Sequence, residues 1–251
     1  MDLMESLRAR AAADPQRVTF FEGDNPKMMR VVGELSSARL AKCCLVGEDE
    51  ALHRVAEEVG VDLGGIEVVD VCNEEANEVF ACCFEQVPGC PWKPKAIRRH
   101  AKRPMDRAFM MQRADETDVA FGGIDCSTGD VITAGQTIVG LADGVDVISS
   151  LGICNIPGWE GPEGSLLGFG DAAVCIDPNP EQLASIAIAS AETVRALLGW
   201  EPRVAMLSYS TDGSAESELV EGVREAVGLA RERRPDLKID GEFQLDAAIR
   251  P

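Results

Sequence analysis

Short apolar runs alternate with amphipathic segments along most of this 251-residue chain. A short apolar run bounded by turn residues is typical of a buried strand, whereas apolar positions three or four apart are typical of a helix. Strand followed by helix, repeated, predicts an α/β protein with a parallel sheet. The predicted strands are 18–21, 40–46, 66–71, 117–123, 145–153, 166–176 and 203–207. The predicted helices are 48–59, 74–84, 131–139 and 216–233, with two more that Asn25 and Asn179 cap.

The segment around the last predicted strand is the most informative. Residues 203–207 are almost wholly apolar, as expected for a strand covered on both faces. The hydroxyl-rich loop 208–214 joins this strand to the helix 216–233, and such a loop is where open α/β sheets bind ligands. Free backbone N–H groups and the helix dipole favour anionic oxygens, so phosphate is the expected ligand. The alternative is a plain turn in which Ser214 caps the helix, and this segment alone does not decide between the two.

A basic segment and a second polar loop extend this hypothesis. Residues 93–113 hold eight of the 24 basic residues with Asp106 as the only acid, which makes them a candidate anion site. The loop 124–130 lies between an apolar strand and a predicted helix, as loop 208–214 does. The alternative for the basic segment is a solvated helix face whose charges pair with neighbouring acids. The basic residues are Lys93, Lys95, Arg98, Arg99, Lys102, Arg103, Arg107 and Arg113.

Charge and cysteine content exclude several classes of protein. The net charge of −19 argues against nucleic-acid or anionic-lipid partners. No apolar stretch approaches a membrane span, and residues 1–17 do not read as a secretory signal, so we expect a cytoplasmic protein. The nine cysteines include the adjacent pairs 43–44 and 82–83, which suit neither a disulfide nor a zinc site. We therefore expect no metal and no permanently bound cofactor.

Three segments of the second half carry a family resemblance. They are 169–174 (FGDAAV) with 182–193 (QLASIAIASAET), 201–211 (EPRVAMLSYST) and 240–248 (DGEFQLDAA). They resemble the phosphate acetyltransferase/phosphate butyryltransferase family, with a continuous match from Leu167 to Ala248. Weaker matches at 18–24, 98–100 and 127–130 extend the resemblance to nearly the whole chain.

The resemblance implies a fold, a reaction and a set of binding residues. The fold would be a three-layer α/β/α arrangement like that of isocitrate and isopropylmalate dehydrogenases. It would have two domains, 1–143 and 144–251, with a cleft between them, and the protein would be a homodimer. The reaction would be reversible transfer of an acetyl or other short acyl group between coenzyme A, which is a substrate here, and inorganic phosphate. Arg98 matches a family arginine associated with ligand phosphates. The other implied substrate-binding residues are Ser127, Thr128, Asp130, Ser208, Ser210, Thr211 and Ser214.

The sequence departs from the family pattern at three places. The family's catalytic Asp and Ser-Arg pair lie in an Asn-Asp-Leu-Ser-Arg-Gly type segment near the carboxyl end. This sequence ends at Pro251, before such a segment and before a strand that usually completes the second domain. Cys126 stands where the family usually has His, and Thr133 where it usually has Arg. No catalytic residue is therefore assigned apart from Cys126 as a candidate.

Three hypotheses for function stay open. The first is a phosphate acyltransferase acting on coenzyme A and acetyl phosphate. The second is a non-catalytic family member that binds acyl-CoA or phosphate, or a subunit that complements a larger acyltransferase assembly. In the third, Cys126 itself forms an acyl thioester, which requires that the basic segment or a helix start lowers the pKa of its thiol.

Overall fold

The computed structural model describes residues 3–90 and 92–250. The residues outside this description are Met1, Asp2, Pro91 and Pro251. The expectation about the end of the chain concerns Pro251 and therefore also falls outside the described residues. The chain divides into two compact units, Met1–Gly140 and Leu141–Pro251. Among the described residues, none of the helices has both the length and the apolar character needed to span a membrane.

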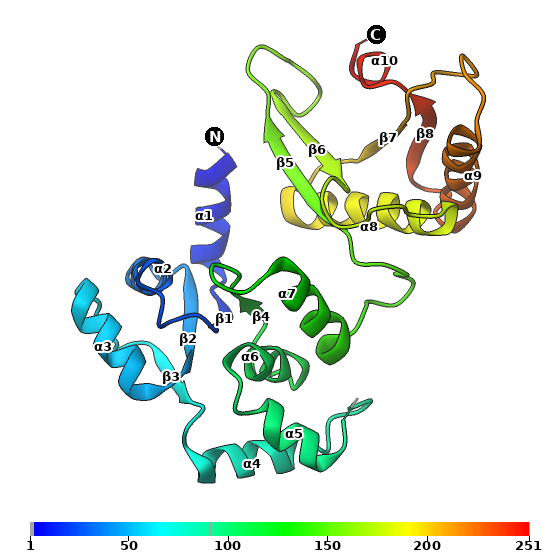
Figure 1. Cartoon of the computed structure of the whole chain (residues 1–251). Coiled ribbons are helices and arrows are strands. Elements are labelled where there is room, and N and C mark those ends of the chain that lie inside the picture. Colours follow the sequence, from blue (N-terminus) through cyan, green and yellow to red (C-terminus); the bar gives the residue numbers. More distant parts are fainter. Residues whose placement is uncertain (1–2, 91, 251) are drawn as a thin grey trace. The chain divides into compact units, whose positions relative to one another are not determined.

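The first unit is built on a four-stranded parallel sheet (Figure 1). Its strand order is β3-β2-β1-β4, and all three pairings are parallel, which confirms the expected α/β class. The strands are β1 (Gln16–Phe20), β2 (Ala41–Gly47), β3 (Glu67–Asp70) and β4 (Val119–Phe121). The helices are α1 (Leu3–Ala13), α2 (Pro26–Ser37), α3 (Asp49–Val59), α4 (Glu74–Phe84), α5 (Pro94–His100), α6 (Pro104–Arg113) and α7 (Thr128–Ala134). A π-helical turn, Gly135–Val139, continues α7, so the predicted helix 131–139 is only partly α-helical.

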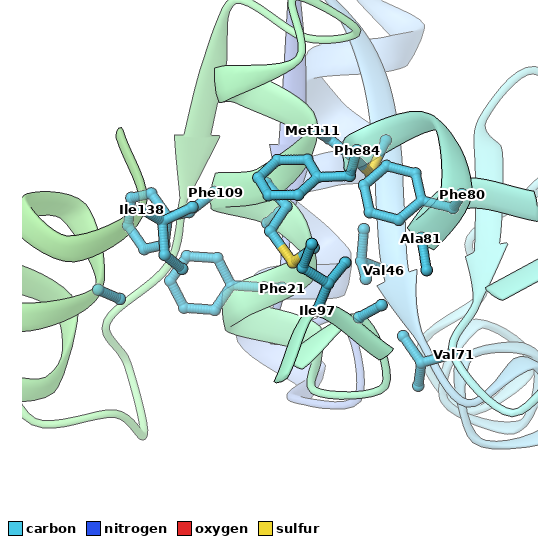
Figure 2. Close-up of a cluster of buried hydrophobic side chains, with 14 of the residues drawn as sticks. Phe21, Val46, Val71, Phe80, Ala81, Phe84, Ile97, Phe109, Met111 and Ile138 are labelled. Atoms are coloured by element: carbon cyan, nitrogen blue, oxygen red, sulfur yellow. The ribbon is translucent and has the colours of Figure 1, made fainter. Parts of the chain in front are cut away.

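Two separate cores cover the two faces of this sheet. Strand alternation sends Cys43 and Leu45 of β2 to one core, with α2 and α3, and Cys44 and Val46 to the other. The second core joins β2 to α4, α5, α6 and the π-helical turn, and Figure 2 shows its labelled members, among them the ring of Phe21. Because both faces are covered, β2 is an almost continuous apolar run.

The second unit combines an antiparallel hairpin with a two-stranded parallel sheet (Figure 1). The hairpin pairs β5 (Leu151–Asn155) with β6 (Leu166–Gly170), and the parallel pair is β7 (Arg203–Leu207) with β8 (Lys238–Phe243). Helix α8 (Pro180–Leu198) begins with the predicted capping box, in which the side chains of Asn179 and Gln182 each accept the other's backbone N–H. Helices α9 (Glu218–Arg233) and α10 (Leu245–Ile249) complete the unit.

Three strand predictions in this unit are wrong. The predicted strand 145–153 is a strand only from Leu151, where its pairing with β6 begins. Strand β7 is not covered on both faces, because α8, α9 and β8 share a single core with Met206 and Val204. Leu207, on the other face, is 44% exposed. The apolar run 166–176 gives a strand only to Gly170, because the chain then folds around the carboxylate of Asp171.

Candidate functional site

The carboxylate of Glu22 organises the loop that follows β4. Glu22 comes two residues after β1, and only 4% of it is exposed. Its Oε2 accepts the backbone N–H groups of Gly123 and Ile124 at 2.6 and 2.7 Å. Its Oε1 accepts those of Asp125 and Cys126 at 2.9 and 2.8 Å. Burial by itself would raise the pKa of this carboxyl, but the four hydrogen bonds outweigh it and lower the pKa to about 2.

This carboxylate was not recognised from the sequence, which assigns Glu22 only to a turn. Two sequence features could have indicated this contact. Glu22 comes just after the predicted strand 18–21, and the glycine pair Gly122-Gly123 comes at the end of the predicted strand 117–123. Gly122 is needed because a Cβ there would lie 2.2 Å from the ring of Phe21, and Gly123 has φ +111°. Because the backbone N–H groups of residues 123–126 are bound to Glu22, this loop can contact an anionic ligand through its side chains but not through these N–H groups.

The predicted binding residues of this loop lie at the start of α7. Ser127 is the N-cap, and its Oγ accepts the N–H of Asp130 at 3.1 Å and donates to Asp130 Oδ2 at 2.7 Å. Thr128 and Asp130 are exposed. Thr133 donates its hydroxyl to the carbonyl oxygen of Gly129 at 2.7 Å. The structure therefore brings Ser127, Thr128 and Asp130 together on one exposed helical turn.

Cys126 does not have the electrostatic environment that a thioester nucleophile needs. Its side chain is half-buried, next to Glu22 and the acids Asp125 and Asp130. Burial, followed by the hydrogen bond and charge of Glu22, raises the pKa of its thiol to about 11. The lowered thiol pKa that the thioester hypothesis requires is therefore absent, because the sulfur is partly buried and its charged neighbours are carboxylates rather than the basic segment.

The basic segment is divided among internal partners. Arg98 donates to both oxygens of Glu78 at 2.7–3.0 Å and to Glu85 Oε1 at 2.6 Å, and these carboxylates raise its pKa. Lys102 pairs with Glu74, and Arg103 with Asp106. For these residues the structure favours the alternative of paired charges. The assignment of Arg98 to a ligand phosphate stays a prediction.

Two further arginines of this segment serve the core. Arg107 is 6% exposed and lies 3.3 Å above the ring of Phe80, and burial lowers its pKa to about 10. Arg113 donates to four backbone carbonyl oxygens, those of Pro88, Gly89, Ile138 and Val139. Neither side chain belongs to a surface anion site.

In the second unit the loop 208–214 is anchored by Glu242, a residue of β8. Glu242 is 3% exposed and accepts from Arg224 Nε at 2.8 Å, from Ser210 Oγ at 2.8 Å and from Gly213 N at 3.0 Å. The Arg224 guanidinium, with these further donors, holds the pKa of Glu242 well below its usual range. Ser210 is fully buried by this arrangement.

Six of the seven backbone N–H groups of this loop are already hydrogen-bonded within the protein, contrary to the premise of a backbone phosphate cradle. Thr211 N donates to Ser214 Oγ at 2.9 Å, and Ser210 N to Ser208 Oγ at 3.2 Å. The alternative in which Ser214 caps α9 is also wrong, because Ser217 is the N-cap and accepts from Val220 N. Ser208 and Thr211 are half-buried and Ser214 is exposed, so their assignment as ligand contacts stays a prediction.

A third carboxylate binds backbone in the same way. Asp171 accepts the N–H groups of Ala173, Val174 and Cys175 at 2.7–3.1 Å and a hydrogen bond from the Ser150 hydroxyl. Burial opposes these bonds, but they lower the pKa of Asp171 well below its usual range. Beside it lies a cavity of about 220 Å³ whose hydroxyl groups come from Ser149, Ser150, Ser190 and Thr193. Among the described residues, no group of three or more His, Cys, Asp or Glu side chains could hold a metal ion.

Comparison with known proteins assigns this α/β chain to a family. The chain matches the model of the phosphate acetyl/butaryl transferase family over residues 2–251. Phosphate acetyltransferases of Clostridium acetobutylicum and Thermoanaerobacterium thermosaccharolyticum are 36% and 35% identical, each over 99% of this chain and 75% and 76% of their own. A solved EutD phosphotransacetylase from Staphylococcus aureus matches with a TM-score of 0.87 and 27% identity, over 100% of this chain and 75% of its own. The chain belongs to the phosphate acetyl/butaryl transferase family and spans about three quarters of the length of these relatives.

We expect Glu22→Gln to destabilise the first unit. An amide offers one acceptor oxygen, so two of the four N–H groups lose their partner, at about 1–3 kcal/mol for each buried donor left unpaired. The free energy of unfolding, measured by urea denaturation at pH 7, should fall by roughly 2–6 kcal/mol. Glu58→Gln, which changes an exposed acid on α3, is the matched control.

The pH dependence of the stability difference between wild type and Glu22→Gln tests whether the ionised carboxylate causes that difference. The pKa of Glu22 is about 2 in the folded protein against an ordinary value of 4.5, so the carboxylate contributes its full stability above pH 4.5. That contribution is lost as pH falls towards 2, and the stability gap between wild type and Glu22→Gln should narrow over the same range. A gap that is independent of pH below 4.5 would rule out the ionised carboxylate as its source.

We expect Cys126 to react slowly with electrophiles at neutral pH. With a thiol pKa of about 11, its alkylation by iodoacetamide should rise about tenfold per pH unit between pH 7 and 10. Peptide-resolved mass spectrometry after timed alkylation measures this rate, and the urea-unfolded chain provides the unshifted reference. After exposure to acetyl phosphate the peptide should carry no acetyl group. Rapid alkylation at pH 7, or an acetyl adduct, would restore Cys126 as a nucleophile.

Proposed function

We propose that this chain catalyses reversible transfer of a short acyl group, acetyl in the first instance, between coenzyme A and inorganic phosphate. One observation carries the proposal: curated phosphate acetyltransferases are 35–36% identical to this chain over 99% of its length. Coenzyme A acts as a substrate. The predicted domains 1–143 and 144–251, the three-layer dehydrogenase-like arrangement, the homodimer and the cytoplasmic location are parts of the same proposal.

The reaction sets three chemical requirements. The coenzyme A sulfur attacks the carbonyl carbon of the acyl phosphate, a C–S bond forms and the C–O bond to phosphate breaks. A base must take the thiol proton, donors must stabilise charge on the carbonyl oxygen, and cations must hold the phosphate. Among the described residues we assign phosphate contact to Arg98 and hydrogen-bonding contacts to Ser127, Thr128, Ser208, Thr211 and Ser214.

Two members of the predicted set have a different part in this proposal. Ser210 acts through the loop, since its buried hydroxyl is bound to Glu242. Asp130 orients Ser127 by accepting the Ser127 hydroxyl. No described residue is assigned as the base, since Cys126 has a raised thiol pKa.

A non-catalytic family member, or a subunit that complements a larger acyltransferase assembly, is the second candidate. This candidate is favoured by the structure around Cys126 and Thr133, the two described positions where the chain departs from the family pattern. Cys126 has a raised pKa, and the Thr133 hydroxyl is bound to a backbone carbonyl oxygen. This candidate predicts binding of coenzyme A without turnover.

Turnover with purified protein separates these candidates. Incubation with acetyl phosphate and coenzyme A should consume free thiol, measured by thiol titration. It should also form acetyl-CoA, measured by the absorbance of the thioester. Calorimetric titration with coenzyme A provides the parallel binding measurement. Binding without turnover of acetyl, propionyl or butyryl phosphate would refute the acyltransferase and support the second candidate.

Arg98→Ala tests the phosphate contact against a matched neighbour. We expect KM for acetyl phosphate to rise at least about tenfold, because one charge-assisted contact to phosphate is lost, with a smaller change in kcat. Lys102→Ala is the control, since Lys102 also pairs with a glutamate on α4 but is assigned no ligand. Equal effects of the two substitutions on KM would remove Arg98 from the phosphate site.

A further inference from the structure

The core in Figure 2 fixes helices α4 and α5 against each other. Its members include Ile97 of α5, which is 1% exposed, and three residues of α4, namely Phe80, Ala81 and Phe84. Arg98 follows Ile97 directly, so its backbone is fixed beside α4. Because its side chain is 36% exposed, an anion in solution can reach the guanidinium.

One side of α4 supplies most of the hydrogen-bond acceptors of this guanidinium. Residues 78, 82 and 85 are four and three positions apart, so they lie on the same side of the helix. Arg98 Nε donates to both oxygens of Glu78 at 2.8 and 3.0 Å, and Nη2 donates to Glu78 Oε1 at 2.7 Å and to Cys82 Sγ at 3.8 Å. Nη1 donates to Glu85 Oε1 at 2.6 Å and to the carbonyl oxygen of Pro94 at 3.1 Å. A guanidinium has five N–H groups, so each of them already has an acceptor within the protein.

The two glutamates bind Arg98 in different ways. Glu78 binds the Nε–Nη2 edge side on, which is the fork geometry in which an arginine recognises a carboxylate or a phosphate. Its side chain is 56% exposed, and the bond to Arg98 lowers its pKa, so it is an ionised group with free access to water. Glu85 binds only Nη1, together with the Pro94 carbonyl, and its side chain is 25% exposed. Exchange of Glu78 for another anion would leave the contacts of Nη1 in place.

This arrangement opposes the approach of an anion while Glu78 is bound. Arg98 contributes one positive charge and the two glutamates contribute two negative charges, so the cluster is net negative. A phosphate can bind the guanidinium only if it takes donors from a carboxylate, because no N–H group is free. The exposed Glu78 is the group to be displaced, since an ion pair at the surface contributes little to stability.

We propose, on the basis of the function proposed above, that Glu78 occupies the place of the ligand phosphate on Arg98 and leaves when the phosphate binds. Glu85 is a positioning residue that holds Arg98 throughout the exchange. A phosphoryl group presents three acceptor oxygens, so it can take over the Nε and Nη2 donors that Glu78 releases. Glu78 therefore lowers the affinity for phosphate without preventing its binding, and the paired charges of the structure are compatible with a phosphate role for Arg98.

Opposite effects of two glutamine substitutions test these roles. Glu78→Gln should lower KM for acetyl phosphate about two- to fivefold, because a neutral amide competes less well for the guanidinium. Glu85→Gln should raise KM for acetyl phosphate about two- to fivefold, because Arg98 loses the charged partner that positions it. In the Arg98→Ala background, Glu78→Gln should have no effect on KM, since the two side chains act through one contact.

Glu74→Gln is the matched control for the change in charge. It removes one negative charge from the same helix, where Glu74 pairs with Lys102, and should leave KM for acetyl phosphate unchanged. Equal decreases of KM in Glu74→Gln and Glu78→Gln would assign the effect to overall charge and overturn the proposal. A lower thermal midpoint of Glu78→Gln with an unchanged KM would show that the ion pair only stabilises the helix contact, which also overturns it.

Calorimetric titration with inorganic phosphate separates failure of this exchange from failure of the proposed function. If the wild type turns over acetyl phosphate but Glu78→Gln changes neither KM nor phosphate affinity, the exchange is refuted and the proposed function stands. If no variant turns over substrate but Glu78→Gln binds inorganic phosphate about two- to fivefold more tightly than the wild type, the exchange is supported and the proposed function fails. If there is neither turnover nor tighter phosphate binding, both are refuted.

Discussion

The loop that follows β4 depends on one constraint: the Glu22 carboxylate accepts hydrogen bonds from four consecutive backbone N–H groups. It joins the end of β1 to the turn after β4, about one hundred residues later. By fixing residues 123–126, it fixes where α7 begins and hence where Ser127, Thr128 and Asp130 stand. Burial, and after it the hydrogen bond and charge of this carboxylate, raise the thiol pKa of Cys126. One buried carboxylate therefore sets both the geometry and the electrostatics of this edge of the sheet.

The second unit uses the same kind of bond twice. Glu242 holds the loop 208–214 with help from Arg224, and Asp171 gathers the amides of residues 173–175. A carboxylate that accepts several N–H groups stays ionised and is stable where it is buried. In this strongly acidic chain, internal carboxylates therefore occupy positions where a phosphate could otherwise bind backbone. A phosphate ligand must be recognised by side-chain cations and hydroxyls, and this directs attention to Arg98 and the exposed hydroxyls rather than to loop amides.

Local signals were sufficient to predict much of the fold. The caps Asn25 and Asn179 started α2 and α8 as predicted, because an N-cap acts within one turn of chain. The polar loops 124–130 and 208–214 could be located for the same reason, since strand ends are visible as ends of apolar runs. Glu22, Asp171 and Glu242 were missed because their partners are set by tertiary folding. The sequence left open whether the basic segment is an anion site or a helix face with paired charges for the same cause: Arg98 and Lys102 meet glutamates of α4 that lie 20 and 28 residues earlier.

The two edges of the parallel sheet differ in how fully their polar groups are satisfied. At the carboxyl edge the loop amides have a protein carboxylate as partner, so the backbone there is rigid and its chemistry must come from exposed side chains. At the amino edge the Thr19 hydroxyl lies in hydrogen-bonding contact with the Cys44 thiol, and the buried Thr117 hydroxyl has no partner among the described residues. An apolar residue at position 117 would be the more stable choice on burial alone. The two edges of the sheet therefore differ in chemistry: one has its loop backbone bound by a carboxylate, and the other keeps an unpaired hydroxyl in its interior.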